Sequence, residues 1–272
     1  MKYKVLGNTG VIVSELCFGS MGFGGTEMWK NVGQIQQKEA DNLVSLAIDG
    51  GINFFDTANI YSNGTSEQIL GKALGAKRKD VILATKVRGR MGKGMNDAGL
   101  TRVHIMKQVD ESLKRLGTDY IDLYQIHGFD KLTPFEETLF ALDDIVKSGK
   151  VRYIGASNLT AWQLMKSLWI SDKYNLNKFK TLQAYYSIAG RDLEREIVPL
   201  LQDQNIGLMI WSPLAGGFLS GKYRRNVLPK EESRRKDYDF PPINKEKAYD
   251  IIDVMDEIGK THNVSVAQVA LA

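Results

Sequence analysis

The chain has 272 residues, of which 43% are hydrophobic and 25% are charged, and its formal net charge is +4. This is the composition of an ordinary globular protein, and the small net charge argues against a nucleic-acid-binding protein. The single cysteine, Cys17, excludes an internal disulfide, and no apolar run resembles a signal peptide or a membrane span, so we expect a cytoplasmic protein.

In chain order, the first residues predict a β-hairpin, because apolar positions alternate from Tyr3 to Val13 around the turn-forming segment Gly7–Gly10. Strands and helices then alternate. The predicted strands cover residues 16–19, 53–56, 80–86, 120–127, 151–155, 180–185 and 206–211. The predicted helices cover residues 40–48, 65–75, 101–116, 133–147, 160–170, 194–203, 245–261 and 265–272.

Polar residues at the predicted helix starts indicate N-caps. Thr65 and Thr101 are expected to cap their helices, and Thr133 is expected to do so with Pro134 at the first helical position and Glu136 completing a capping box. Two further segments are predicted as loops. A glycine-rich loop follows the strand at 16–19, and the basic run 234–236, which has acidic residues on both sides, predicts a solvated loop.

Strands that alternate with helices predict a parallel sheet covered by helices, and the expected closed form is a (β/α)8 barrel of the TIM type with an N-terminal hairpin. No change in composition marks a boundary, so we expect one domain over residues 1–272. The pattern contains no eighth strand. A seven-stranded parallel sheet would expose two edges, so we expect the eighth strand in a C-terminal segment outside this sequence.

Three predicted strands end on a reactive side chain, namely Asp56, Lys86 and His127, and Tyr61 follows Asp56 in the next loop. Active sites of such barrels form at the carboxyl ends of the strands, which lie ~4.8 Å apart. The four side chains are therefore expected to converge. Taken singly, each has a structural interpretation: a loop cap for Asp56, an exposed strand end for Lys86, a core histidine for His127 and loop packing for Tyr61.

Together the four side chains predict proton-transfer chemistry. A free tyrosine has a pKa near ~10, and a nearby ammonium group such as that of Lys86 lowers the pKa of the phenol. Asp56 can hold Lys86 in place, and His127 can donate a hydrogen bond to a substrate oxygen. The set predicts a proton donor for a carbonyl group under reduction. No metal-site spacing is found, because His104 and His262 lack partners of the ligand type, and no nucleophile elbow or glycine-rich dinucleotide fingerprint is present.

The chain resembles the aldo-keto reductases over essentially its whole length. The resemblance rests on Gly19-Ser-Met-Gly22, Asn53 to Tyr61, Ala84-Thr-Lys86, Asp119 to His127, Gly149 to Asn158, Leu182-Gln183 and Trp211 to Gly217. It implies a single barrel that binds a nicotinamide cofactor without a Rossmann fold and reduces aldehydes or ketones reversibly by hydride transfer. By position, Asp56, Tyr61, Lys86 and His127 match the catalytic tetrad of the family, with Tyr61 as proton donor.

The resemblance also implies cofactor contacts. They are Gly19, Met21, Asp56, Ser157, Asn158, Gln183, Trp211, Ser212, Leu214, Gly216 and Lys222. Among these, Ser157, Asn158 and Gln183 match residues that hold the nicotinamide carboxamide. Trp211 matches the aromatic residue that stacks on the nicotinamide ring, and the loop from Ser212 matches the one that wraps the pyrophosphate. The expected cofactor is NADP(H) on the resemblance alone, since no residue of this sequence selects it over NAD(H).

Two other functions remain open. The Trp211 to Gly217 segment also resembles potassium-channel β-subunits, which are redox-sensing regulatory partners. That branch usually has asparagine at the position of His127 and an N-terminal extension, and both differences favour the enzyme. A cofactor-free truncated fragment is the second alternative.

The substrate is expected to be a small or aromatic aldehyde or ketone. Specificity is expected to lie in the loops 21–34, 88–100 and 222–244, and either end of the loop 212–244 could move as a lid. Trp29, Met91 and Met95 are equally compatible with an apolar substrate pocket and with surface packing.

Overall fold

The structure is a computed structural model that describes residues 1–25, 29–226, 235 and 238–272. These residues form two compact units. The first contains residues 1–182 and 200–208, and the second contains residues 183–199 and 209–272. The predicted lid and the predicted specificity loops 21–34 and 222–244 fall partly outside the described residues. The single barrel domain over residues 1–272 stays a prediction.

The N-terminal hairpin has the predicted form, because β1 (Tyr3–Val5) pairs antiparallel with β2 (Ile12–Ser14). Its turn passes close to the start of β8 (Thr181–Tyr185). Gly7 has φ +54°, and a Cβ atom built on it would lie 2.2 Å from the carbonyl oxygen of Lys180. Only glycine combines that backbone conformation with so close an approach, so Gly7 fixes where the hairpin meets the sheet.

The main sheet has seven parallel strands in chain order, β3-β4-β5-β6-β7-β8-β9. The further strands are β3 (Phe18–Gly19), β4 (Phe54–Asp56), β5 (Ile82–Val87), β6 (Ile121–Ile126), β7 (Val151–Ser157) and β9 (Gly207–Trp211). Every residue of β4 and β6 is buried, as expected of parallel strands covered on both faces. The predicted fold class is therefore confirmed: the sheet is that of a (β/α)8 barrel, with no eighth strand among the described residues.

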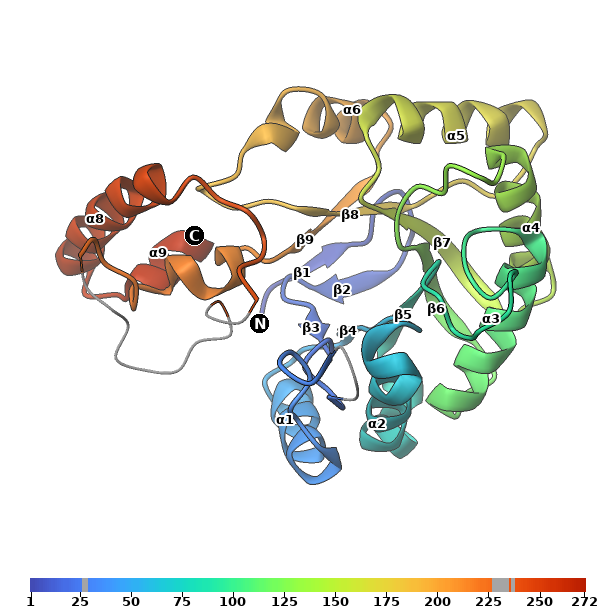
Figure 1. Cartoon of the computed structure of the whole chain (residues 1–272), viewed down its shortest axis with the longest axis horizontal. Helices are drawn as coiled ribbons and strands as arrows, with labels where there is room; N and C mark the ends of the chain where they lie inside the picture. Colours follow the sequence, from blue (N-terminus) through green and yellow to red (C-terminus); the bar gives the residue numbers. More distant parts are fainter. Residues whose placement is uncertain (26–28, 227–234, 236–237) are drawn as a thin grey trace. The chain divides into compact units, whose positions relative to one another are not determined.

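The helices fall between the strands as the periodicity predicts. They are α1 (Gln37–Asp49), α2 (Thr65–Leu74), α3 (Arg102–Leu116), α4 (Phe135–Lys147), α5 (Ala161–Lys173), α6 (Ile197–Asp203), α8 (Lys245–His262) and α9 (Val266–Leu271). Short 3₁₀ segments are η2 (Tyr61–Gly64), η3 (Gly75–Asp80), η4 (Asp192–Glu194) and η5 (Ala215–Ser220). In the first unit, α1 to α5 pack on one another in chain order outside the sheet (Figure 1).

Of the three threonine caps predicted, one is confirmed and two are wrong. Thr101 caps α3, since its Oγ1 accepts the backbone N–H of His104. Thr65 is instead the first residue of α2, and the N-cap is Gly64 in the left-handed region. The N-cap of α4 is Pro134, and the hydroxyl of Thr133 donates to Asp130 Oδ2 at 2.7 Å. A carboxylate close in the sequence thus outcompetes the helix end for that hydroxyl.

The second unit has its own small core, made of Ala215, Phe218, Leu219, Ala248, Ile252, Met255 and Val266. Arg235 belongs to this unit and is buried, so the solvated loop predicted for the basic run is wrong at this residue. Its guanidinium donates to the carbonyl oxygens of Ala215 and Pro241, pairs with Asp239 and lies over the Phe218 ring. These acceptors compensate the burial of the charge. Residues 234 and 236 lie outside the described residues.

None of the described helices is both long enough and apolar enough to cross a membrane.

Candidate active site

The four residues of the predicted tetrad meet in the first unit. Asp56 is the last residue of β4, Lys86 lies one residue before the end of β5, and His127 follows β6 directly. The Lys86 Nζ atom lies 2.5 Å from Asp56 Oδ2 and 3.4 Å from Tyr61 Oη. The Tyr61 and His127 rings pack edge to face with their centroids 5.6 Å apart. The side chains therefore converge, while their catalytic roles stay predictions.

Tyr61 is positioned by the turn that follows it. Ser62 has φ 47°, and its hydroxyl donates to the Phe23 carbonyl oxygen at 2.8 Å and accepts the Gly25 N–H at 2.9 Å. A Cβ atom on Gly24 would lie 2.7 Å from the Ser62 Cβ, so the predicted glycine-rich loop approaches as closely as glycine allows. These contacts tie the turn carrying Tyr61 to the loop after β3.

Lys86 is a fully buried ammonium group, and its donors are directed at fixed acceptors. Besides Asp56 and Tyr61, it donates to the carbonyl oxygen of Thr57 at 2.8 Å. Asp56 is held in turn by Gln125, whose Nε2 donates to Asp56 Oδ1 at 3.0 Å. Gln125 is not among the site residues predicted from the sequence. The available signal was its position two residues before His127, which places both on one face of the strand.

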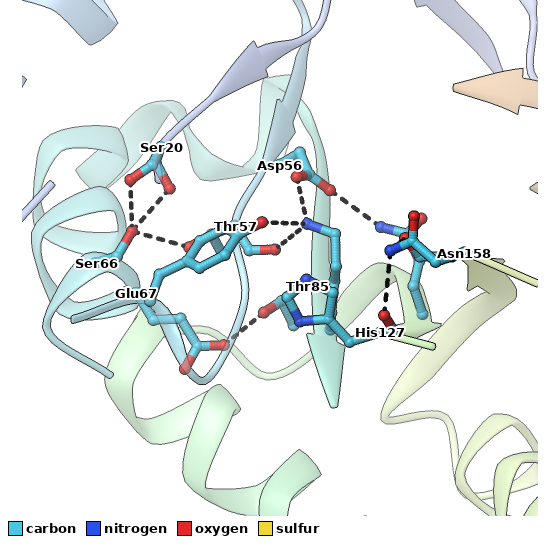
Figure 2. Close-up of polar contacts among 12 residues, drawn as sticks. Ser20, Asp56, Thr57, Ser66, Glu67, Thr85, His127 and Asn158 are labelled. Atoms are coloured by element: carbon cyan, nitrogen blue, oxygen red, sulfur yellow. Dashed lines mark hydrogen bonds and ion pairs between the residues drawn. The ribbon is translucent and has the colours of Figure 1, made fainter. Parts of the chain in front are cut away.

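The side chain of Thr57 belongs to a cluster of buried hydroxyl groups (Figure 2). The Ser66 hydroxyl lies 3.1 Å from Thr57 Oγ1 and donates to the Ser20 carbonyl oxygen at 2.7 Å. Glu67, the next residue, accepts from Thr85 Oγ1 at 2.6 Å, and Thr85 precedes Lys86 in β5. The first turn of α2 thus joins β3, β4 and β5 around the lysine.

The electrostatics of Lys86 and Tyr61 differ in one respect from the expectation. Burial acts to lower the pKa of Lys86, but Asp56 and Tyr61 raise that pKa above its ordinary value. Burial raises the pKa of Tyr61 by more than the charge of Lys86 lowers it. The predicted net lowering of the Tyr61 pKa is therefore wrong for the protein as described, because desolvation of the phenolate outweighs its attraction to the ammonium. The result is a protonated phenol beside a charged lysine.

His127 is neutral at physiological pH. Burial, followed by the charges of Lys86 and Arg88, lowers the pKa of its imidazole to about 3. A neutral imidazole keeps one N–H, which can donate a hydrogen bond to an uncharged oxygen. His127 therefore suits the predicted role of binding a carbonyl oxygen beside Tyr61.

The low pKa of His127 makes the protein less stable in acid. The imidazole has a pKa of about 3 in the folded protein and ~6.5 when unfolded, so between these values only the unfolded chain binds the proton. Stability is lost as the pH falls from 6.5 toward 3. We compare the melting temperature of His127→Gln with that of the wild type at pH 7 and at pH 4.5. The difference should change by about 3 °C or more in favour of the variant at the lower pH.

The matched control is His262→Gln, since His262 lies exposed in the last turn of α8. This variant measures what the loss of a surface histidine does to the melting temperature at each pH. If the His127→Gln and wild-type melting curves shift in parallel with pH, the depressed pKa of His127 is refuted.

Among the residues predicted to hold a cofactor, those of the first unit lie close to the tetrad. Ser157 ends β7, and Asn158 follows it with φ 54°. The Asn158 Nδ2 donates to Ser157 Oγ at 2.9 Å and to the His127 carbonyl oxygen at 3.4 Å. Gly19 ends β3, and a Cβ atom on it would meet nothing within 4 Å. Met21 is partly buried in the following loop.

The remaining predicted contacts belong to the second unit. Gln183 is buried in β8, and Trp211 ends β9 with its ring stacked on Phe240 at 5.4 Å between centroids. The next turn has a run of positive φ angles, at Ser212, Ala215, Gly216 and Gly217. It also contains Leu214, and Lys222 follows with an exposed ammonium. Consecutive amides in such turns form concave surfaces that suit phosphate oxygens, and amide side chains suit a carboxamide. Within its own unit, each set of donors therefore has the chemistry that the resemblance implies for it.

Trp29, Met91 and Met95, which the sequence allows either in an apolar pocket or at the surface, differ in the structure. The Trp29 ring packs edge-on against Tyr61 with centroids 5.5 Å apart, and its buried Nε1 has no hydrogen-bond partner in the described part of the chain. Met91 is partly buried, whereas Met95 is 92% exposed. Trp29 is thus an apolar wall beside the phenol, and Met95 lies at the surface.

In the part of the chain that the structure describes, no group of three or more histidine, cysteine, aspartate or glutamate side chains is placed to hold a metal ion. His104 is buried, and its Nε2 lies 3.2 Å from the Gly89 carbonyl oxygen.

Comparison with known proteins agrees with this geometry. The Aldo/keto reductase family matches residues 15–272. Versiconal hemiacetal acetate reductase of Aspergillus parasiticus is 37% identical over 100% of this chain and 84% of its own length. The uncharacterized oxidoreductase YrpG of Bacillus subtilis is 39% identical over 99% of this chain and 83% of its length. A probable voltage-gated potassium channel subunit beta of Arabidopsis thaliana is 36% identical over 100% of this chain and 83% of its length. The chain therefore belongs to the aldo-keto reductase family of oxidoreductases.

Proposed function

We propose that this protein reduces aldehydes and ketones to alcohols with NADP(H), and that Tyr61 is the proton donor. The observation that carries the proposal is the position of the Tyr61 hydroxyl, 3.4 Å from a fully buried lysine that Asp56 holds at 2.5 Å. A neutral histidine packs against the same phenol. An acid, a charge that stabilises its conjugate base and a neutral hydrogen-bond donor are the groups that carbonyl reduction requires.

The protein groups divide this work. Tyr61 and His127 would both hydrogen-bond the carbonyl oxygen, which orients the substrate. As negative charge develops on that oxygen, Tyr61 donates its proton, and the positive charge of Lys86 stabilises the phenolate left behind. Asp56, fixed by Gln125, keeps Lys86 charged and in place. The bound nicotinamide would supply the hydride for the carbonyl carbon.

The cofactor assignment extends to the residues with matching chemistry in each unit. In the first unit these are Gly19, Met21, Asp56, Ser157 and Asn158. In the second unit they are Gln183, Trp211, Ser212, Leu214, Gly216 and Lys222. The choice of NADP(H) rests on the family resemblance. A cytoplasmic location and one barrel domain over residues 1–272 belong to the same proposal. Relatives that are named reductases and aryl-alcohol dehydrogenases support a carbonyl–alcohol reaction.

The test combines a binding and a turnover measurement on the same preparation. NADPH and NADH are titrated with tryptophan fluorescence as the signal, and NADPH oxidation is then followed with benzaldehyde. Quenching by NADPH at lower concentration than by NADH, together with turnover, is the expected result. Binding without turnover on a panel of aldehydes and ketones would favour a redox-sensing partner like the channel subunits. Absence of binding by either nucleotide would refute the proposal and favour a cofactor-free fragment.

A further inference from the structure

Arg88 is a charged residue beside the tetrad that has no part in the proposed proton transfer. It follows Val87, the last residue of β5, whose carbonyl oxygen accepts the His127 N–H at 2.9 Å. Its Nε donates to the Phe129 carbonyl oxygen at 3.0 Å. A Cβ atom on Gly128 would lie 3.8 Å from the Arg88 Cδ, Nε and Cζ atoms. The side chain therefore lies along the backbone that directly follows His127.

The same turn contacts the tetrad on its other side. A Cβ atom on Gly89 would lie 2.5 Å from the Ile60 Cβ, and Ile60 immediately precedes Tyr61. The Arg88–Gly89 turn is thus held between the segment that carries Tyr61 and the segment that carries His127. The influence of the Arg88 charge on the His127 pKa agrees with this placement.

The hydrogen bond to the Phe129 carbonyl oxygen uses only the Nε atom of the Arg88 guanidinium. Arg88 is exposed, and among the described residues its Nη1 and Nη2 make no hydrogen bond or ion pair. Burial acts to raise the pKa of Asp130, but its hydrogen bonds and, to a smaller extent, the nearby charge of Arg88 lower that pKa below its ordinary value. Its oxygens already accept the Leu100 and Leu132 N–H groups and the Thr133 hydroxyl. Phe129, whose carbonyl oxygen accepts this hydrogen bond, is held in place because its ring packs on Phe135 and Trp162.

The surrounding loop reinforces the positive charge. Residues 88–100 contain Arg88, Arg90 and Lys93 and a single acid, Asp97, which pairs with Lys107 at 2.8 Å. Arg90 differs from Arg88, because its Nη1 donates to the Gly94 and Gly92 carbonyl oxygens of its own loop. Among the described residues of this loop, Arg88 is therefore the arginine whose Nη1 and Nη2 atoms both lack a hydrogen-bond partner.

We propose that Arg88 binds a carboxylate on the substrate, so that the enzyme prefers aldehydes and ketones whose apolar body carries a carboxylate. The inference rests on the proposed reductase function and names its substrate class. A guanidinium fork matches the two oxygens of a carboxylate, which an ammonium group does not. Trp29 and Tyr61 provide the apolar wall for the body of such a substrate.

The experiment compares two matched substrates, 4-carboxybenzaldehyde and its neutral methyl ester, by the ratio of their kcat/KM values. The wild type should prefer the acid. In Arg88→Gln the ratio of acid to ester should fall about tenfold, mainly through KM for the acid, since a partly exposed charge pair is lost. Arg88→Lys should recover part of the ratio. Arg90→Gln, the matched arginine two residues on, should keep the wild-type ratio.

Added salt supplies a second readout. It should lower the acid-to-ester ratio of the wild type and have little effect on that of Arg88→Gln, because exposed charge pairs are screened. An equal ratio in the wild type and in Arg88→Gln would overturn the inference while leaving the reductase proposal intact. An equal fall of the acid-to-ester ratio in Arg90→Gln would overturn the inference too. The general positive charge of the loop, and not a contact with Arg88, would then explain the preference. If the wild type reduces other aldehydes or ketones but neither of these two, the inference alone is overturned. If it reduces none of them, the proposed function fails and the inference with it.

Discussion

Replacement of Tyr61 by phenylalanine should lower kcat/KM for aldehyde reduction by about 10²–10⁴-fold, the usual contribution of a general acid. The substitution removes one oxygen atom and keeps the ring, which packs against Trp29 and His127. Its effect on the free energy of unfolding should be no more than about 1–2 kcal/mol, because the lost hydrogen bond to Lys86 is long. The NADPH dissociation constant should stay near the wild-type value, and it is measured on the same preparation.

Tyr124→Phe is the matched control. Tyr124 is also fully buried, and its hydroxyl has no hydrogen-bond partner among the described residues. This variant should keep wild-type turnover and should not be less stable. If Tyr61→Phe also retains turnover, Tyr61 is not the proton donor, and another acid must be sought.

Lys86→Met should lower kcat/KM by about 10²-fold or more, because the phenolate left by Tyr61 loses its counter-charge. It should also change the pH dependence of the reverse reaction, alcohol oxidation, in which Tyr61 must accept a proton. The charge of Lys86 lowers the pKa of Tyr61, so removing it raises that pKa. The rise of the oxidation rate with pH should therefore move to higher pH in the variant.

The loss of stability in Lys86→Met has to be distinguished from its loss of catalysis. Removing Lys86 leaves the buried Asp56 carboxylate without its counter-ion, which costs about 3–5 kcal/mol of stability. The double variant Asp56→Asn with Lys86→Met removes both charges and should recover most of the melting temperature without recovering turnover. Lys107→Met, at an exposed lysine that pairs with Asp97, is the control for loss of a surface ion pair. Recovery of activity in the double variant would contradict the role assigned to Lys86.

Much of the fold follows from the sequence because its determinants are local. Hydrophobic periodicity identifies the strands and the helix faces, and the strand ends at Asp56, Lys86 and His127 follow from where apolar runs stop. Parallel strands place their carboxyl ends at one edge, so the convergence of these side chains follows from topology without knowledge of any distance. Helix N-caps are predicted less reliably from the sequence, as Thr65 and Thr133 show. A one-residue shift of the helix start or a neighbouring carboxylate changes the partner of the hydroxyl.

Other features of the site depend on contacts between distant parts of the chain. Gln125 supports Asp56 from 69 residues away, and Arg88 is anchored by a carbonyl oxygen 41 residues further on. The buried Arg235 likewise depends on acceptors that its charged neighbours in the sequence do not reveal.

The order of apolar runs and polar ends along the chain identifies which groups reach the carboxyl ends of the strands and thus what chemistry they offer. Which protonation states these groups have depends on how the chain packs. The direction of the Tyr61 pKa shift is the difference between the desolvation of a buried phenol and its attraction to a buried ammonium. Both contributions depend on burial, which arises when segments distant in the chain pack together, and no local pattern records their balance.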